Sequence, residues 1–245
     1  MRATTTCCLF ALFFFGTLRA AAQEEWTDYT SIRDGFQAQF PGQPRVVETT
    51  WKSQAGFTLP SRIYSVDRGR EHYSVTVADY SNIPALGKER IRTCTTVDEI
   101  CVGSSLSGEG FWKHDTRGAM LYATASLLKR DAKVLDLAWN QIARVQTYVL
   151  TLRNNSDEST TYAAVVMHEM MLYIVEGTRP KGSPSPVQFA GSFQVLVKGS
   201  DRPPNYGDQL YVHEVHGLRQ TPPPPPSPPG SRGPVLYNLD GTPSR

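Results

Sequence analysis

The clearest sign of the fold class is Gly35-Phe36-Gln37-Ala38-Gln39-Phe40-Pro41-Gly42-Gln43-Pro44. Phe36, Ala38 and Phe40 alternate with two glutamines, which is the period-two pattern of a half-buried β-strand. The two prolines and the glycine that follow favour a turn. We predict that Arg45–Lys52 forms the next strand, so that the two strands make an opening hairpin.

The same alternation continues along the chain. Tyr73, Val75 and Val77 alternate with small polar residues, as in a half-buried strand. Residues 134 to 145 fit a helical template as well as an extended one, so the start of the strand that ends near Arg153 stays open. The remaining predicted strands are Ala119–Lys129, Ile142–Arg153, Tyr162–Met167 and Met171–Glu176, with a loop at Asn154–Asp157.

Two helices are expected among these strands. The first covers Ala85–Thr93. The second begins after Ser185, the predicted N-cap, with Pro186 at the first helical position and Gln188 completing a capping box. Its apolar face comprises Phe189, Phe193, Leu196 and Val197. The pattern predicts an α+β domain, in which an antiparallel sheet of about six to eight strands is covered by helices.

Composition places the chain among folded globular proteins and excludes some functions. Of 245 residues, 40% are hydrophobic and 20% charged, and the formal net charge is +2. This charge is too small for the basic field of a nucleic-acid-binding protein. We therefore expect no nucleic acid as a partner.

The first 22 residues predict export. Arg2 precedes the apolar run Leu9–Phe15, and Ala20–Ala22 offers small residues for cleavage before Gln23. We expect a periplasmic or secreted protein after cleavage near Ala22, with no transmembrane segment in the mature chain. The expected organisation is a signal peptide over 1–22, an α+β domain over 23–198 and a Pro-rich tail over 199–245.

Cleavage would leave two cysteines, Cys94 and Cys101. Two cysteines in an oxidising compartment predict a disulfide. Within one continuous helix their Cα atoms would lie about 10 Å apart, beyond the reach of a disulfide, so the bond requires a bend. Thr96 and Glu99 have capping-box spacing and would start a new helical turn there. A metal site is the weaker interpretation, because no second pair of ligands lies nearby.

The tail is the most distinctive segment outside the domain. Eleven of the 18 prolines lie between Pro203 and Pro243, so we expect a disordered, extended polyproline arm without a core. One interpretation is a ligand for an aromatic groove, and the other is a spacer that carries the apolar cluster Val235–Leu239. The candidate partner-docking residues are Pro222, Pro225, Pro228, Leu236 and Tyr237.

Three short motifs carry a resemblance to a known family. Together with Gly35–Pro44, the stretches Leu172–Gly177 and Gln188–Phe193 resemble bacterial exported proteins of the PsbP/LpqN-like fold. The resemblance covers roughly residues 29–197 and implies an antiparallel sheet between helices. It further implies a docking or accessory domain without an obvious enzyme activity.

No motif predicts a catalytic, cofactor-binding or metal-binding residue. His168-Glu169 lacks the second histidine of a zinc-protease motif and fits a hairpin turn better. Met167, Met170 and Met171 are better explained by core packing than by copper binding. The basic patches Arg68–Arg70 and Lys88–Arg92 fit a solvated turn and a solvated helix face. For Trp51, Trp112 and Trp139, packing in the core or at its rim is favoured over a pocket.

These observations predict an exported, non-enzymatic accessory or binding protein of the bacterial envelope that docks to a protein partner. The alternative is a carrier with a small-molecule pocket between the sheet and the helices. A hydrolase without a recognisable motif is the third possibility, and it would have to assemble its site from distant residues such as His72, Asp79, His114 and Asp115.

Overall fold

Two antiparallel sheets form the framework of the protein in a computed structural model that describes residues 26–93, 112–142, 145–197 and 199–204. The larger sheet has seven strands in the order β3-β4-β5-β9-β8-β7-β6, and the smaller has the order β1-β2-β10. The strands are β1 (Thr27–Ser31), β2 (Phe36–Phe40), β3 (Arg45–Lys52), β4 (Thr58–Arg68), β5 (Glu71–Asp79), β6 (Ala132–Ile142), β7 (Val145–Asn154), β8 (Thr160–His168), β9 (Met171–Arg179) and β10 (Gln194–Val195).

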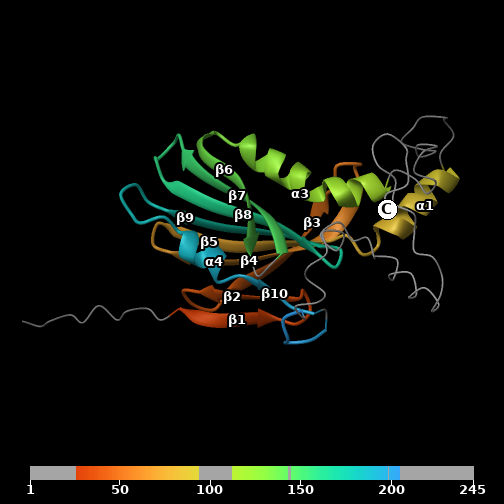
Figure 1. Cartoon of the computed structure of the whole chain (residues 1–245), viewed down its shortest axis with the longest axis horizontal. Helices are drawn as coiled ribbons and strands as arrows, with labels where there is room; N and C mark the ends of the chain where they lie inside the picture. Colours follow the sequence, from red (N-terminus) through yellow and green to blue (C-terminus); the bar gives the residue numbers. More distant parts are fainter. Residues whose placement is uncertain (1–25, 94–111, 143–144, 198, 205–245) are drawn as a thin grey trace, which may run out of the picture.

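The elements form layers on either side of the large sheet (Figure 1). Helix α3 (Trp112–Leu128) packs on β8 and β9 from one side. The short helix α4 (Val187–Gly191) and the small sheet lie on the other side, where α4 contacts β9, β8 and β2. Helix α1 (Ile83–Thr93) contacts α3 beyond the end of β5. The expected α+β class, with an antiparallel sheet of seven strands and short helices, is confirmed.

The central strands are buried on both faces because both layers cover them. In β8, Ala163 to Met167 are all fully buried, and in β9 the run from Met171 to Val175 is buried as well. A continuous apolar run of this length is typical of a strand without a solvent face. The predicted strands Tyr162–Met167 and Met171–Glu176 are therefore confirmed, each within a longer strand.

The layer below the sheet is closed by aromatic side chains. Phe36 of β2 contacts the Tyr64 ring at a centroid distance of 4.9 Å and the Phe193 ring at 5.9 Å. Tyr73 and Phe189 meet at 5.3 Å. These distances are those of packed edge-to-face and stacked rings, so the space between the two sheets is a filled core.

The predicted opening hairpin is wrong. Strand β2 pairs with β1 and β10, whereas β3 pairs with β4 in the other sheet. Both edges of β2 are therefore occupied by other strands, and the segment Pro41–Pro44 carries the chain from one sheet to the other. Alternation identified both strands, but it does not specify a strand's partner.

The predicted strand over Ala119–Lys129 is also wrong, since these residues lie in and just after α3. Ala119, Met120, Ala123 and Leu127 are buried, and their spacing is that of one helix face. Alanine, leucine and methionine are strong helix formers, which agrees with the observed structure.

Near the end of the domain the helix is shorter than predicted. Helix α4 spans only Val187–Gly191, no side-chain cap is made at its start, and the chain continues into β10. Phe189, Phe193 and Leu196 are buried as expected, but Val197 is exposed. Strand pairing of β10 with β2 takes up the residues that follow Gly191, so the helix ends before the long apolar face is complete. The helix predicted over Ala85–Thr93 is confirmed by α1.

Candidate functional site

Strand β6 forms one edge of the seven-stranded sheet. Its eleven residues pair with β7, and no other described strand lies beside it. The backbone N–H and C=O groups on its outer side are therefore available to another strand. The helical alternative for residues 134 to 145 is excluded for the described part of that range, because residues up to Ile142 lie in β6 and Val145 begins β7, which pairs with β6.

The orientation of β6 follows from the register of its neighbours. Tyr173 faces the small sheet, because its hydroxyl donates a hydrogen bond to the Asp34 carbonyl at 2.7 Å. Val166 and Thr147 continue the same cross-strand row. Leu150 lies three positions from Thr147 and so points to the opposite face, the one on which α3 packs.

One face of β6 continues the row of apolar side chains that β7 contributes to the core on the α3 side of the sheet. Leu137 is opposite Leu150, and Trp139 is opposite Tyr148, so these pairs share a face. Leu150 is fully buried, whereas Leu137 is 47% exposed and Trp139 is 57% exposed. The apolar row therefore runs from the covered core out to an uncovered edge.

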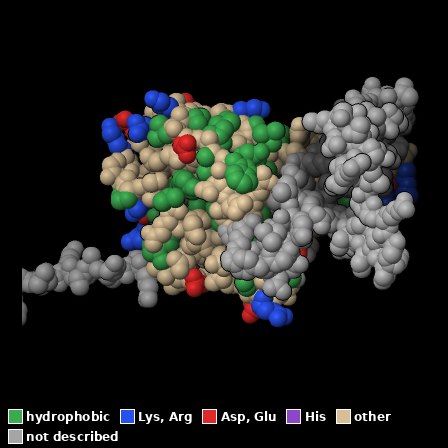
Figure 2. All heavy atoms as spheres, in the orientation of Figure 1, with side chains coloured by type: hydrophobic (Ala, Val, Ile, Leu, Met, Phe, Trp, Pro, Cys, Tyr) green, Lys and Arg blue, Asp and Glu red, His purple; other side chains and the backbone are tan. Residues whose placement is uncertain are grey.

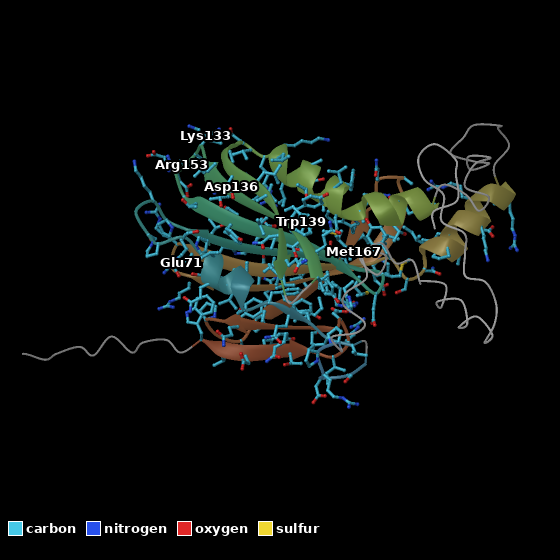
Figure 3. All side chains as sticks on the ribbon, in the orientation of Figure 1. Glu71, Lys133, Asp136, Trp139, Arg153 and Met167 are labelled. Carbon is cyan, nitrogen blue, oxygen red and sulfur yellow. The ribbon has the colours of Figure 1, made fainter. Side chains whose placement is uncertain are left out.

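The remaining apolar and polar residues of β6 lie on different faces of the strand. Val134 lies opposite Leu152 on the apolar side, and Leu135 occupies a register shift between Val134 and Asp136. Lys133, Asp136 and Asn140 are exposed polar residues. Figure 3 labels Lys133, Asp136 and Trp139 along this strand. Such separation is the pattern of a strand with one face to be covered.

Helix α3 carries two exposed leucines, Leu121 and Leu128, which are seven residues apart and so share one flank of the helix. Figure 2 shows hydrophobic side chains gathered on the viewed face over β6 and α3. We call the exposed apolar side chains of the edge strand the β6 surface, and it comprises Val134, Leu135, Leu137 and Trp139.

The opposite edge of the same sheet provides an internal comparison. Strand β3 carries Arg45, Glu48 and Lys52, and exposed Val46 is its one large apolar residue of comparable exposure. Charged side chains along an edge strand discourage pairing with other chains. Strand β6 also carries the charged residues Lys133 and Asp136, but it exposes four large apolar side chains where β3 exposes one, so the two edges differ in what they can bind.

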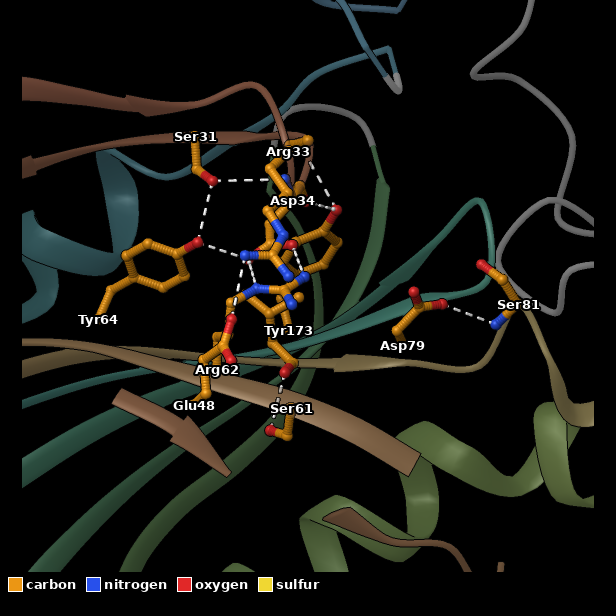
Figure 4. A network of polar contacts seen from close by, with 12 residues as sticks. Ser31, Arg33, Asp34, Glu48, Ser61, Arg62, Tyr64, Asp79, Ser81 and Tyr173 are labelled. Carbon is orange, nitrogen blue, oxygen red and sulfur yellow. Dashed lines mark hydrogen bonds and ion pairs between the residues drawn. The ribbon is translucent and has the colours of Figure 1, made fainter. Parts of the chain in front are cut away.

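A second cluster of functional groups is buried between the sheets (Figure 4). Asp34 accepts hydrogen bonds from the Arg62 guanidinium and from the Tyr64 hydroxyl, the latter at 2.5 Å. The Tyr64 hydroxyl also lies 3.0 Å from Ser31 Oγ. The hydrogen bond to Asp34 raises the pKa of Arg62, and burial with the same carboxylate raises the pKa of Tyr64 to about 12. This cluster holds the β1–β2 turn against β4.

A third polar group lies where α3 begins. Asp115 is buried and accepts a hydrogen bond from the Ala55 backbone N–H at 3.1 Å. Its Oδ2 has no hydrogen-bond partner among the described residues. Burial raises the pKa of Asp115, although hydrogen bonds from the Ser53–Ala55 turn oppose that shift. The nearby Arg90 guanidinium donates to the Ala55 carbonyl at 2.7 Å and lies 3.6 Å from the Phe57 ring centroid.

The histidine of the turn between β8 and β9 is also buried. His168 Nε2 lies 4.0 Å from Glu169 Oε1, and burial lowers the pKa of the imidazole. Glu169 and Met170 have φ values of 44° and 65°, so they form the hairpin turn predicted for this position. Met167 and Met171 are buried in the core, which confirms the packing explanation.

Of the four residues considered for an assembled hydrolase, His72 and Asp79 do not share a site. His72 and Asp79 are at opposite ends of β5, where His72 Nδ1 lies 2.6 Å from Asp67 and Asp79 accepts from the Ser81 N–H. Asp115 lies at the start of α3, and the side chain of His114 is outside the described part. Among the described residues, no group of three or more His, Cys, Asp or Glu could hold a metal ion.

Several predicted residues fall outside the described ranges. These are the disulfide pair Cys94 and Cys101 and the tail residues Pro222, Pro225, Pro228, Leu236 and Tyr237. The signal peptide over 1–22 falls outside them as well. Within the described ranges, Arg68–Arg70 forms the β4–β5 turn, and no helix is long and apolar enough to span a membrane.

Sequence reasoning did not identify the β6 surface. Trp139 was assigned to the core or its rim, and residues 134–145 were ambiguous between helix and strand. The sequence offers a signal in the apolar series Val134, Leu135, Leu137 and Trp139, which only Asp136 and Ala138 interrupt. That series predicts a covered face, and only the position of α3 over β8 and β9 leaves it exposed.

Comparison with known proteins adds a similarity of fold. No protein-family model matches the sequence, and no curated protein matches it. The structure is similar to the solution structure of cyanobacterial PsbP (CyanoP) from Synechocystis sp. PCC 6803, with 14% sequence identity and a TM-score of 0.39. The match covers 74% of this chain and 99% of that chain. This structure has the PsbP-like fold that the sequence motifs resemble, and the similarity concerns the fold alone.

Proposed function

We propose that this protein is an exported, non-enzymatic accessory or binding protein of the bacterial envelope, and that it docks to a protein partner through the β6 surface. The observation that carries the proposal is the exposed row of Val134, Leu137 and Trp139, which continues the buried row of β7 at a sheet edge that no further strand of the described residues pairs with. Apolar side chains beside open backbone groups suit an extended protein strand better than a small molecule.

The buried polar clusters support a non-enzymatic role. Asp34 and Arg62 satisfy each other between the sheets, and Asp115 holds the turn between β3 and β4. The contacts of Asp34 and Arg62, and that of Asp115 Oδ1, thus join segments of the fold to one another. The aromatic packing between the sheets also favours docking over the alternative of a carrier pocket, because side chains occupy that space.

Site-specific photo-crosslinking in the native exported compartment tests the proposal. A photoreactive residue at Gln141 would sit on β6 without altering its apolar side chains, and mass spectrometry would identify what it captures. We expect one specific partner for the wild-type surface and at least about a tenfold loss of that product in the double variant Leu137→Ser with Trp139→Ser, because both side chains belong to the centre of the contact.

The variant Val46→Ser is the matched control, since it removes a similarly exposed apolar side chain from the other sheet edge. It should leave the crosslinked product unchanged. Equal capture by the double variant and the wild type would contradict the proposal. Loss of the product only when Pro222, Pro225 and Pro228 are substituted would place docking in the tail instead.

A further inference from the structure

We infer that the β6 surface is covered by the chain's own C-terminal segment, Val235-Leu236-Tyr237-Asn238-Leu239, until a partner strand displaces it. The inference rests on the proposed function in one respect, namely that β6 accepts an extended strand. It adds the identity of a first occupant and a regulatory consequence, which is competition between this segment and the partner.

The composition of the segment fits the edge. Four of its five residues have apolar or aromatic side chains, and two of these, Val235 and Tyr237, are of types that favour strands. Gly233-Pro234 precedes the segment and Asp240-Gly241 follows it. A short segment with these boundaries can add one strand to an open edge without continuing further. Its apolar side chains would cover Leu137 and Trp139, which the described layers leave exposed.

The length of the connecting chain permits this contact. The described residues end at Pro204, and 30 residues, 205 to 234, lie between that point and Val235. Such a chain spans at most about 100 Å when extended, while a domain of this size is about 40 Å across. The segment can therefore reach β6 from any point on the surface.

Attachment within one chain favours this occupant over a second copy. A tethered segment experiences an effective concentration of the order of millimolar, well above the concentration of a dilute protein. Contact within the chain should therefore dominate at micromolar protein. A partner strand must then bind β6 more tightly than the chain's own segment does, which gives selectivity to docking.

The chain contains a useful alternative segment, Leu210-Tyr211-Val212. It also has apolar residues, but only five residues, 205 to 209, separate it from Pro204, and they span at most about 18 Å. The chain reaches Pro204 soon after α4, and α4 packs on β9. The edge strand β6 is three strands away from β9, so a linker of five residues is short for this distance. We therefore assign the longer-tethered segment to β6 and keep Leu210–Val212 as a control.

Hydrogen exchange measured by mass spectrometry on the full chain tests this inference. In the wild type, backbone amides in the peptide covering 132–142 should exchange about tenfold more slowly than in the variant Leu236→Ser with Tyr237→Ser, because a paired edge must open before it exchanges. The control variant Leu210→Ser with Val212→Ser should match the wild type. Adding a synthetic peptide of residues 233–241 at millimolar concentration should restore protection to the first variant.

Equal exchange of β6 in the wild type and in the Leu236→Ser, Tyr237→Ser variant would overturn the inference. Exchange that slows as protein concentration is raised tenfold would assign β6 to a second copy and would overturn it as well. These outcomes are distinct from failure of the proposed function, which is measured by the crosslinked partner. If both hold, the Leu236→Ser, Tyr237→Ser variant should capture more partner than the wild type.

Discussion

At the scale of single residues, the buried ion pair of Asp34 and Arg62 takes two charged side chains out of water. The Asp34 side chain is fully buried and the Arg62 side chain is 10% exposed, so both charges have left water. Their ion pair and the hydrogen bond from Tyr64 offset that loss. Removal of one partner leaves an unpaired buried charge, which costs more than the pair contributes.

We therefore expect Asp34→Ala to lower the free energy of unfolding by about 3–5 kcal/mol, since Arg62 loses its counter-charge. The double variant Asp34→Leu with Arg62→Leu should lose less than the sum of the two single changes, because no charge then remains buried. Urea unfolding of the three variants measures both effects. Strict additivity of the two single losses would contradict this account of the pair.

Asp115 predicts a dependence of stability on pH. Burial raises its pKa in the folded state, so the unfolded chain loses this proton first as the pH rises. The contribution of Asp115 is then complete below its unfolded pKa and is lost as the pH rises through its folded pKa. Asp115→Asn keeps an acceptor for the Ala55 N–H but cannot ionise.

The expected result is that the free energy of unfolding of Asp115→Asn, relative to wild type, rises between pH 3 and pH 7. The readout is the change of this difference with pH, because any cost of the amide itself is the same at every pH. Urea midpoints at several pH values measure it. Asp28→Asn, at an exposed carboxyl on β1, controls for the change in net charge. A relative stability that falls with pH would contradict the assigned direction.

At the scale of elements, the approach of α4 to β9 depends on Gly177. A Cβ atom at this position would lie 2.9 Å from Pro186 Cβ and 3.4 Å from the Tyr73 ring. Pro186 is the residue before α4, and its ring has little freedom to move. Any side chain at Gly177 must therefore push the start of α4 away from the sheet.

We expect Gly177→Ala to lower the free energy of unfolding by about 1–3 kcal/mol, the usual cost of overpacking a core. Gly191→Ala is the matched control, since a Cβ there meets no heavy atom within 4 Å and alanine is favoured in a helix. Thermal or urea unfolding compares the two. Equal effects of both substitutions would show that the approach of α4 is not limiting.

Elements also show why prediction from sequence succeeded in some places. Strands β8 and β9 and helix α1 were predicted because their residue types and periods agree with their final surroundings. Helix α3 was predicted as a strand, since the pattern of Ala119–Leu127 was read with the wrong period. The hairpin of β2 and β3 was wrong because pairing depends on β10, which lies about 150 residues later in the chain.

At the scale of the whole molecule, the two sides of the large sheet are covered to different extents. The aromatic layer of the small sheet and α4 closes one side, and the single helix α3 lies over β8 and β9 on the other. A helix is about 10 Å wide, so one helix covers about two strands of a sheet spaced at 4.8 Å. The apolar face of β6 therefore extends beyond what α3 can cover.

The sequence by itself determined the α+β class and the alternation of strands such as β2 and β5, because these depend on residue type and local spacing. The tertiary structure alone decided which strands pair, that Asp34 meets Arg62, and that Leu137 and Trp139 remain exposed while Leu150 is buried. The physical reason is that burial depends on what lies above a residue. Local sequence cannot specify how far a helix from another part of the chain extends over a sheet.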